Sequence, residues 1–487
     1  MKSATENTSP GIHPKTVFIL ALALRLVLFL YSGPWKDDWP QRLTYVGDPF
    51  EYAILGRSLV TRGEFSLTWP APMPNALRLP AYPLFIGLTS AGAQLDKLWV
   101  TILCQIVIDS LFAVFLMHCL RLLFQKRAIG GIAGVLYACN PDAILWSTQL
   151  LAEPISLWMI VGALYGLAAV GELAAGRARG RFVAGVLCAS VLPFCKPVWQ
   201  YLWLLLLCWL LFAILRRRSR PALGWLIAGS LVVAAPGLAW MKRNYDAWGV
   251  FTLSVSKPYV QKVSAEGILL WAGTGSEMAV PEYSHEMKMH FLIPDFSQPD
   301  AMPAAFMQVT EWDRNAMAAD YRNGAEFYAL VRSRHWPLYL KQHVVGTAYL
   351  LFSPATNYVR RFIGSYSGSE ENFGFIGGAD LGTKDKFLGF LRRSLADPVA
   401  ILWTGAVVAY LAFYYLATLA GLMPYWKEYR WNIWTLFLAG GGAFVFLLGP
   451  VGSSRYRFVL IQAFLPLAAL GLSRWWKRDG VRSVRSS

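Results

Sequence analysis

The amino-acid sequence predicts an all-α polytopic membrane protein that crosses the bilayer about ten times. Hydrophobic residues make up 56% of the 487-residue chain and charged residues only 15%, and the apolar residues are gathered in runs long enough to span a bilayer as helices. A net charge of +16 would also suit a nucleic-acid-binding protein. The basic residues, however, cluster at the ends of the apolar runs, where they set topology and contact anionic lipids. We therefore expect the lipid bilayer as a partner and no nucleic acid.

Ten apolar runs are the candidate membrane spans, and most have the length that a helix needs to cross a bilayer at about 1.5 Å per residue. The run at 182–194 is short, and only Cys195-Lys196-Pro197 separates it from the next run. The stretch 336–351 is also apolar, but Lys341 and His343 argue against a span there. The ten runs comprise residues 15–32, 98–124, 128–144, 151–170, 182–194, 198–215, 221–241, 399–422, 431–448 and 458–472.

The distribution of these runs divides the chain into three parts. Residues 1–241 are predicted to form an N-terminal transmembrane domain, whose first outer loop, 34–95, carries interfacial helices. Residues 242–398 are mostly polar, with Pro, Gly and Ser, and predict a long extracytoplasmic region of mixed structure. Residues 399–487 supply the last transmembrane helices and a basic cytoplasmic tail.

Lysine and arginine residues in the short loops predict the orientation of the spans, because such loops stay on the cytoplasmic side. In the ten-span arrangement the basic loops at 126–127, 177–181, 216–220 and 427–430 all fall on one side. Both termini are therefore expected to be cytoplasmic, in a cytoplasmic (inner) membrane. The ionisable residues that fall on the opposite, extracytoplasmic side are Asp48, Glu153, Lys196, Arg243 and Arg455.

The most informative segment is the polar stretch 47–84, which follows the first span. Asp48-Pro49-Phe50-Glu51 is typical of a helix start, with an acidic capping residue, a proline in the first turn and a glutamate three residues on. A proline-rich return then brings Arg78 and Tyr82 back toward the bilayer. Helix capping alone would explain Asp48, and a carboxylate that accepts backbone N–H bonds has a lowered pKa and is a poorer base.

Asp48-x-x-x-Tyr52 after the first span, followed by Arg78-Leu79-Pro80-Ala81-Tyr82-Pro83, resembles the first outer loop of the GT-C membrane glycosyltransferases. These are polyprenyl-phosphate-sugar-dependent enzymes related to protein mannosyltransferases and lipid A aminoarabinose transferases. The return differs from the Arg-Pro-Pro-Gly-Tyr-Pro expected in that family but keeps its arginine. Further stretches occur in the expected order, so the resemblance covers almost the whole chain: Asn140-Pro141 through Glu153-Pro154, Arg243-Asn244-Tyr245 and Arg455-Tyr456-Arg457.

The resemblance implies that Asp48 is the catalytic carboxylate, acting as general base on the acceptor hydroxyl. Glu153 is the second acidic candidate, and Asp142 competes with it at a similar depth. Arg78 and Arg455 are the preferred ligands of the donor phosphate, because cations stabilise a departing phosphate. As an alternative, each basic residue could anchor the protein to lipid headgroups. The remaining candidates are Lys196, Arg243 and Arg457 as phosphate helpers, and Glu51, Tyr52 and Tyr82 as substrate-loop residues.

The function expected from these residues is transfer of a sugar from a polyprenyl-phosphate donor to a lipid, glycan or protein acceptor. The sequence identifies no cofactor, and a divalent metal is left open, since the spacing of His285, Glu286 and His290 is not a standard zinc pattern. A transporter or flippase of lipid-linked sugars is one alternative, but it should place ionisable residues near the bilayer midplane. Only Arg25 is clearly that deep, as a structural or a functional partner. A polymerase or ligase of lipid-linked glycans is the other alternative, and it would need a pyrophosphate-linked donor.

Overall fold

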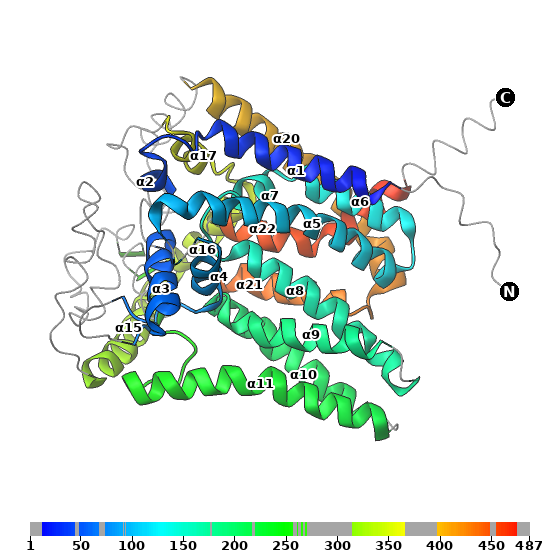
Figure 1. Cartoon of the computed structure of the whole chain (residues 1–487). Helices are drawn as coiled ribbons and strands as arrows, with labels where there is room; N and C mark the ends of the chain where they lie inside the picture. Colours follow the sequence, from blue (N-terminus) through cyan, green and yellow to red (C-terminus); the bar gives the residue numbers. More distant parts are fainter. Residues whose placement is uncertain are drawn as a thin grey trace, which may run out of the picture.

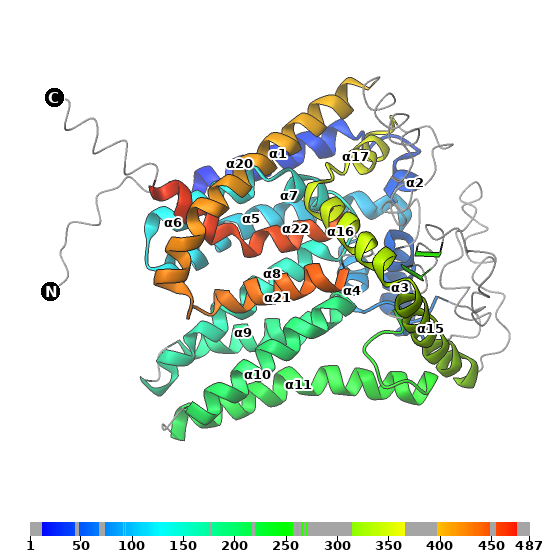
Figure 2. The same cartoon turned by 180° about the vertical axis from the view of Figure 1, so that it is seen from behind.

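A computed structural model of the protein describes residues 12–43, 48–67, 74–90, 92, 94–175, 178–216, 220–256, 261, 264–265, 268–269, 314–365, 397–448 and 454–474. Regular structure within these residues is helical, apart from one isolated antiparallel bridge between Ser66 and Pro74. Most of the helices lie side by side as a bundle with two distinct ends (Figures 1 and 2). The predicted all-α class is therefore confirmed for the described residues.

The helices follow one another from the N-terminal to the C-terminal part of the chain. They are α1 (Pro14–Tyr31), α2 (Trp39–Leu43), α3 (Asp48–Arg62), α4 (Ala81–Thr89), η2 (Leu95–Lys97), α5 (Leu98–Phe124), α6 (Arg127–Ala138), α7 (Pro141–Trp146), α8 (Glu153–Leu167), η3 (Ala168–Ala175), α9 (Arg179–Val191), η4 (Leu192–Phe194), η5 (Pro197–Trp199), α10 (Gln200–Arg216), α11 (Arg220–Trp248), α15 (Arg314–Arg334), α16 (Trp336–Phe352), α17 (Thr356–Ile363), α20 (Pro398–Tyr429), α21 (Trp434–Leu448) and α22 (Ser454–Ala463).

Six helices of the described residues are long and apolar enough to cross a membrane, and a bent pair would make a seventh. The bent pair joins Arg455–Ala463 to Leu465–Arg474 at an angle of 53°. The predicted count of about ten spans is therefore not confirmed. Three of the predicted spans correspond to the shorter helices α6, α9 and α21. The six helices are Pro14–Tyr31, Leu98–Phe124, Glu153–Leu173, Pro197–Arg216, Ala222–Trp248 and Pro398–Tyr429.

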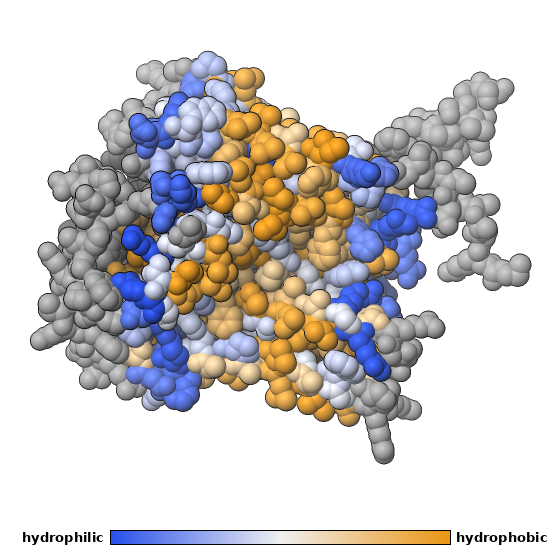
Figure 3. Space-filling model, viewed as in Figure 1, coloured by the Kyte–Doolittle hydropathy of each residue, from blue (hydrophilic) through white to orange (hydrophobic). Residues whose placement is uncertain are grey.

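The surface has the distribution of polarity expected of a membrane protein. On the face seen in Figure 3, an apolar band crosses the middle of the bundle, and hydrophilic residues lie toward both ends. The start of α1 and the end of the bent pair lie at the same end (Figure 1), which we call the basic end. It is rich in cationic residues, as a cytoplasmic face would be, and that sidedness stays a prediction. Its described basic residues include Lys15, Arg121, Lys126, Arg127, Arg179, Arg181, Arg216, Arg220, Lys427, Arg430 and Arg474, with Glu172 and Glu428 as acidic neighbours.

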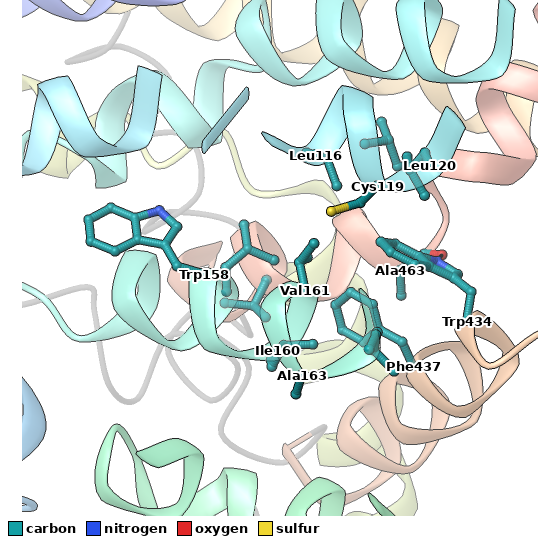
Figure 4. Packing of buried hydrophobic residues seen from close by; sticks show 14 of the residues in the cluster. Leu116, Cys119, Leu120, Trp158, Ile160, Val161, Ala163, Trp434, Phe437 and Ala463 are labelled. Carbon is teal, nitrogen blue, oxygen red and sulfur yellow. Dashed lines mark hydrogen bonds between the residues drawn. The ribbon is translucent and has the colours of Figure 1, made fainter. Parts of the chain in front are cut away.

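The bundle is held together by a hydrophobic core to which helices distant in sequence contribute. Leu116 and Leu120 of α5 and Val161 of α8 pack in one cluster with Trp434 of α21 (Figure 4). The indole of Trp434 also donates a 2.8 Å hydrogen bond to the carbonyl of Ala463 in α22. Within a bilayer such contacts stabilise the bundle by close van der Waals packing and interhelical hydrogen bonds, because lipid tails are as apolar as these side chains. The core thus fixes α22, which carries Arg455, against the N-terminal helices.

Helices α3 and α4 lie at the end of the bundle opposite the basic end (Figures 1 and 2) and outside the candidate spans. They cross closely because Gly56 of α3 faces Gly87 of α4. A Cβ atom at Gly56 would lie 2.4 Å from the carbonyl oxygen of Pro83, and one at Gly87 would lie 2.6 Å from the carbonyl oxygen of Gly56. This contact ties the middle of α3 to α4, and the interfacial placement of the two helices stays a prediction.

Candidate functional site

The site begins at the start of α3, which the structure places at Asp48, with Pro49 next and Glu51 in the same turn. Both carboxylates are engaged by arginines. Asp48 Oδ1 lies 2.6 Å from Arg78 Nη1, and Asp48 Oδ2 lies 2.7 Å from Arg455 Nη1. Arg78 also donates hydrogen bonds of 2.7 and 3.0 Å to the two carboxylate oxygens of Glu51. The acidic first turn thus binds two cations from distant parts of the chain.

Arg78 is held in place by contacts to the backbone of the return segment. The side chain of Asn75 accepts a 2.8 Å hydrogen bond from the Arg78 amide, and the Asn75 carbonyl accepts one of 2.6 Å from Arg243. The hydroxyl of Ser254 donates a 2.6 Å hydrogen bond to the carbonyl of Leu77. Arg243, predicted to help bind phosphate, is therefore engaged by the return segment, and the structure does not bring it into contact with Asp48.

Arg455 and Arg457 belong to the first turn of α22 and point in different directions. Residues two apart on a helix differ by about 200° in direction, so Arg455 reaches Asp48 while Arg457 reaches the other side. Arg457 donates two hydrogen bonds of 2.7 Å to the carboxylate of Asp142 and a third, of 2.5 Å, to the carbonyl of Ser353. Arg457 is fully buried. This closed pair joins α22 to α7 and to the end of α16, away from Asp48.

A second carboxylate, Glu153, starts α8 and is almost completely buried. The ammonium group of Lys196, which lies between η4 and η5, donates a hydrogen bond to Glu153 Oε1. Arg455 Nε lies 3.6 Å from the same oxygen. The other oxygen, Oε2, is buried and has no hydrogen-bond partner among the described residues. Lys196 also lies 4.3 Å from the ring centroid of Tyr456. Arg455 therefore links the Asp48 pair to the Glu153 pair.

Together these side chains form what we call the polar cluster, with three carboxylates and three cations in largely buried positions. Burial alone would raise the pKa of Asp48, but the charges of Arg78, Arg455 and Lys196 hold it well below its usual range. Burial raises the pKa of Glu51 despite the adjacent Arg78. Asp48 therefore stays ionised in the free protein. The members of the polar cluster are Asp48, Glu51, Arg78, Glu153, Lys196 and Arg455.

The two substrate-loop tyrosines lie in different surroundings, although their rings pack edge to face with centroids 5.3 Å apart. Tyr52 borders the polar cluster, since the guanidinium carbon of Arg78 lies 5.7 Å from its ring centroid. Tyr82 is fully buried, and its hydroxyl donates a 3.0 Å hydrogen bond to Gln105 of α5. Gln105 in turn binds the carbonyl of Ser147 at 2.8 Å. Tyr82 therefore fastens α4 to the segment that leads into α8.

A separate buried ion pair lies deeper in the bundle. Arg25, which the sequence marked as structural or functional, places Nε 2.8 Å from Asp109 Oδ2. The hydroxyl of Tyr137 and the indole of Trp158 donate hydrogen bonds of 2.7 and 2.9 Å to Asp109 Oδ1. Asp109 was not among the predicted residues, although an acidic residue inside an apolar run marks a partner for an intramembrane cation.

Metal binding is open in this structure. No group of three or more His, Cys, Asp or Glu side chains within the described ranges is arranged to hold a metal ion. His285, Glu286 and His290 lie outside those ranges. We therefore assign no step to a metal.

Fold and site together define a multi-helix membrane protein with a buried ionic cluster at one end. No protein-family model matches the sequence, and no curated protein matches it. One similar solved structure is the archaeal oligosaccharyltransferase AglB from Archaeoglobus fulgidus, in complex with an inhibitory peptide and a dolichol-phosphate. It is 12% identical in sequence and aligns with a TM-score of 0.47. The alignment covers 97% of this chain and 51% of that one. The apo form of the Archaeoglobus fulgidus oligosaccharyltransferase is 11% identical, with a TM-score of 0.44 over 97% and 52% of the two chains.

The chain spans about half the length of the solved proteins it aligns with. Because the likeness is distant, we base the proposed function on the polar cluster and not on the alignment.

Proposed function

We propose that the protein is a glycosyltransferase that moves a sugar from a polyprenyl-phosphate donor to the hydroxyl of a lipid, glycan or protein acceptor at the outer face of the membrane. One observation supports this most strongly. The Asp48 carboxylate lies between Arg78 and Arg455, outside the candidate spans and at the level where they end. A base and two phosphate-binding cations are the groups that such a transfer needs at the membrane surface.

In the proposed reaction the acceptor oxygen attacks the anomeric carbon of the donor sugar and loses its proton to Asp48. The bond between the anomeric carbon and the phosphate oxygen breaks, and the polyprenyl phosphate leaves with the bonding electron pair. Arg78 and Arg455 stabilise the charge that develops on this phosphate. Lys196 supplies a third cation near the same place, while Glu153 balances its charge.

The ion pairs of Asp48 suggest how donor binding prepares the base. In the free protein both of its oxygens are engaged by arginines, and its lowered pKa makes it a weak base. A phosphate that takes up Arg78 and Arg455 would compete with Asp48 for the same cations. Asp48 would then be released next to the acceptor with a pKa closer to its usual value. Deprotonation of the acceptor would thus depend on a loaded donor site.

Arg243 and Arg457 have positioning roles in this proposal. Arg243 holds the carbonyl of Asn75 and thereby the segment that presents Arg78. Arg457 holds the first turn of α22, which presents Arg455, through its pair with Asp142. A direct contact of either residue with phosphate is not needed.

A transporter of lipid-linked sugars is the less favoured function. Its ionisable residues should lie near the bilayer midplane, at broken helices. The deep pair of this protein, Arg25 and Asp109, is occupied by its own hydrogen bonds, whereas the polar cluster lies at the ends of the helices. A polymerase of lipid-linked glycans would share this placement and differ in its donor.

The donor separates these functions. Purified full-length protein is incubated with a panel of polyprenyl-phosphate sugars and with matched polyprenyl-pyrophosphate sugars, each with a mixture of candidate acceptors, and the freed lipid is measured. Release of polyprenyl phosphate that Asp48→Asn abolishes supports the proposal. Turnover of the pyrophosphate donors alone would assign the protein to the polymerase class. Sugar movement across a vesicle membrane without lipid release would make it a transporter.

A further inference from the structure

A cavity with charged side chains lies at the basic end, far from the polar cluster. The cavity, of about 570 Å³, opens between the ends of α5, α8 and α10 and the turn that joins α20 to α21. This volume is within the range of about 300–1,000 Å³ that small-molecule sites occupy. None of the residues that line it takes part in the proposed transfer.

The walls of the cavity are apolar, and its charges are mostly positive. Leu123, Trp209 and Ile433 contribute apolar and aromatic surface, while Arg181 and Arg216 contribute cations. One carboxylate, Glu172, also lines it and lies 2.6 Å from Arg181 Nη2. Arg181 Nε is buried and has no hydrogen-bond partner among the described residues. Glu172 therefore balances the charge of Arg181 within the cavity, and Arg216 gives the cavity a net positive charge.

The cavity lies at the level where the bundle would leave the bilayer. The candidate span Pro197–Arg216 ends at Arg216, and Glu153–Leu173 ends next to Glu172. Trp431, which also lines the cavity, is 90% exposed in the turn between α20 and α21. Tryptophan is enriched at the membrane–water interface. An occupant should thus be anionic where the arginines lie and apolar below.

We propose that this cavity binds the headgroup and the adjoining acyl-chain segments of one anionic phospholipid. Basic pockets between transmembrane helices on the cytoplasmic side suit such headgroups. Apolar walls next to two arginines match an amphiphile with a phosphate at its polar end better than a soluble anion, which would leave the walls without a partner. The lipid would fasten α10 to the turn between α20 and α21, which the hydrogen bond from Asn432 to the carbonyl of Leu123 (2.8 Å) already ties to α5.

The test is native mass spectrometry of the delipidated full-length protein titrated with dioleoylphosphatidylglycerol or dioleoylphosphatidylcholine, whose acyl chains are identical. Wild type should retain one phosphatidylglycerol at least tenfold more tightly than phosphatidylcholine. The double variant Arg181→Gln/Arg216→Gln should lose about thirtyfold in this affinity, at roughly fivefold for each charge near the surface. The control Arg121→Gln/Arg127→Gln removes the same charge from exposed positions at the same end and should change it little.

A second pair of variants leaves charge unchanged. Gly171 lines the cavity, and a Cβ there meets no atom within 4 Å; the same is true of Gly180, which does not line it. Gly171→Leu should weaken phosphatidylglycerol binding, whereas Gly180→Leu should not. Equal affinity of wild type for the two lipids would overturn the proposal. So would equal losses in the arginine variant and its control, or in the two glycine variants. None of these outcomes depends on glycosyl transfer.

Discussion

Two buried arginine–carboxylate groups in this protein are built from the same residue types but have different roles. Around Asp109, each carboxylate oxygen is taken up by its own neighbours: Arg25 binds one, and Tyr137 and Trp158 bind the other. Around Asp48, the partners within the described residues are the cations Arg78 and Arg455, and each of them is shared with a further carboxylate, Glu51 or Glu153. The first group is closed by two neutral hydrogen-bond donors. In our proposal the second is an exchangeable set of charges, in which a phosphate can take the place of a carboxylate.

The comparison extends to the edge of the polar cluster. Arg457, which follows Arg455 by two residues, forms a closed pair with Asp142. Glu153, in contrast, keeps one buried oxygen without a hydrogen-bond partner in the described part of the chain. Burying such an atom costs free energy unless a ligand or water completes its hydrogen bonds. Both oxygens of Asp109 and of Asp142 are engaged, so a buried carboxylate oxygen without a partner distinguishes Glu153 from these two carboxylates.

The largest effect is expected from removing the charge of Asp48. Asp48→Asn keeps the size of the side chain and should lower turnover about 10²- to 10⁴-fold, the usual contribution of a general base. Asp142→Asn is the matched control, because it makes the same change in the closed pair. It should lower thermal stability and, because the Arg457–Asp142 pair acts on Arg455 only by positioning it, should lower turnover per folded molecule far less than Asp48→Asn does. Similar turnover losses in both variants would remove the distinction between the two groups.

Breaking the deep pair should affect stability and not chemistry. Arg25→Ala leaves Asp109 as an uncompensated buried charge and should cost roughly 3–5 kcal/mol of stability. Arg25→Met combined with Asp109→Leu removes both charges and should recover a large part of this loss. The measurement is the thermal midpoint in detergent, with turnover per folded molecule as the second readout. Normal stability together with lost turnover in Arg25→Ala would place this pair in the catalytic machinery.

Replacing the phosphate-binding arginines should have the next largest effect. Arg78→Ala and Arg455→Ala should each lower turnover about a hundredfold, which corresponds to roughly 2–4 kcal/mol of transition-state stabilisation. The lysine variants should recover activity only in part, because an ammonium group cannot reproduce the planar guanidinium fork. Initial rates and donor affinity are measured for each variant. Full activity of both lysine variants would indicate lipid-headgroup anchors instead.

A smaller effect should appear in the pH dependence. Asp48 must be ionised to act as a base, so the rate falls as pH drops through its pKa. That pKa is lowered in the free protein, and it should rise when phosphate takes up the arginines. The acid limb of kcat, which reports the loaded enzyme, should thus lie at higher pH than that of kcat/KM, which reports the free enzyme. Coincident acid limbs would argue against competition between Asp48 and phosphate.

Much of the fold was predictable because helix periodicity, apolar runs and the Asp48-Pro49 start are local signals. The number of membrane spans was less predictable from the sequence. The segment around Asn140 and Pro141 interrupts one apolar run, so α6 is shorter than the run 128–144. Helix α9 ends at Val191, where η4 with Pro193 begins. Run length alone therefore overestimates the length of a continuous helix, because polar and proline residues end helices inside apolar stretches.

The placement of candidate residues at one end of the bundle followed from counting spans, and the structure brings Asp48, Glu153, Lys196 and Arg455 into one cluster. Which arginine pairs with which carboxylate could not be predicted. Arg455 and Arg457 are chemically identical and two residues apart, so their roles depend on the rotation of α22. Packing against α7 and α16 fixes that rotation.

The central claim is that Arg78 and Arg455 hold Asp48 until a lipid phosphate displaces it. The most direct test is the affinity of wild type and Asp48→Asn for polyprenyl phosphate without a sugar, measured on the purified proteins in the same detergent. Removing the competing carboxylate should tighten binding about tenfold, equivalent to ~1.4 kcal/mol, although transfer is lost. The Asp142→Asn control should bind like wild type. Equal or weaker binding of polyprenyl phosphate by Asp48→Asn would contradict the claim.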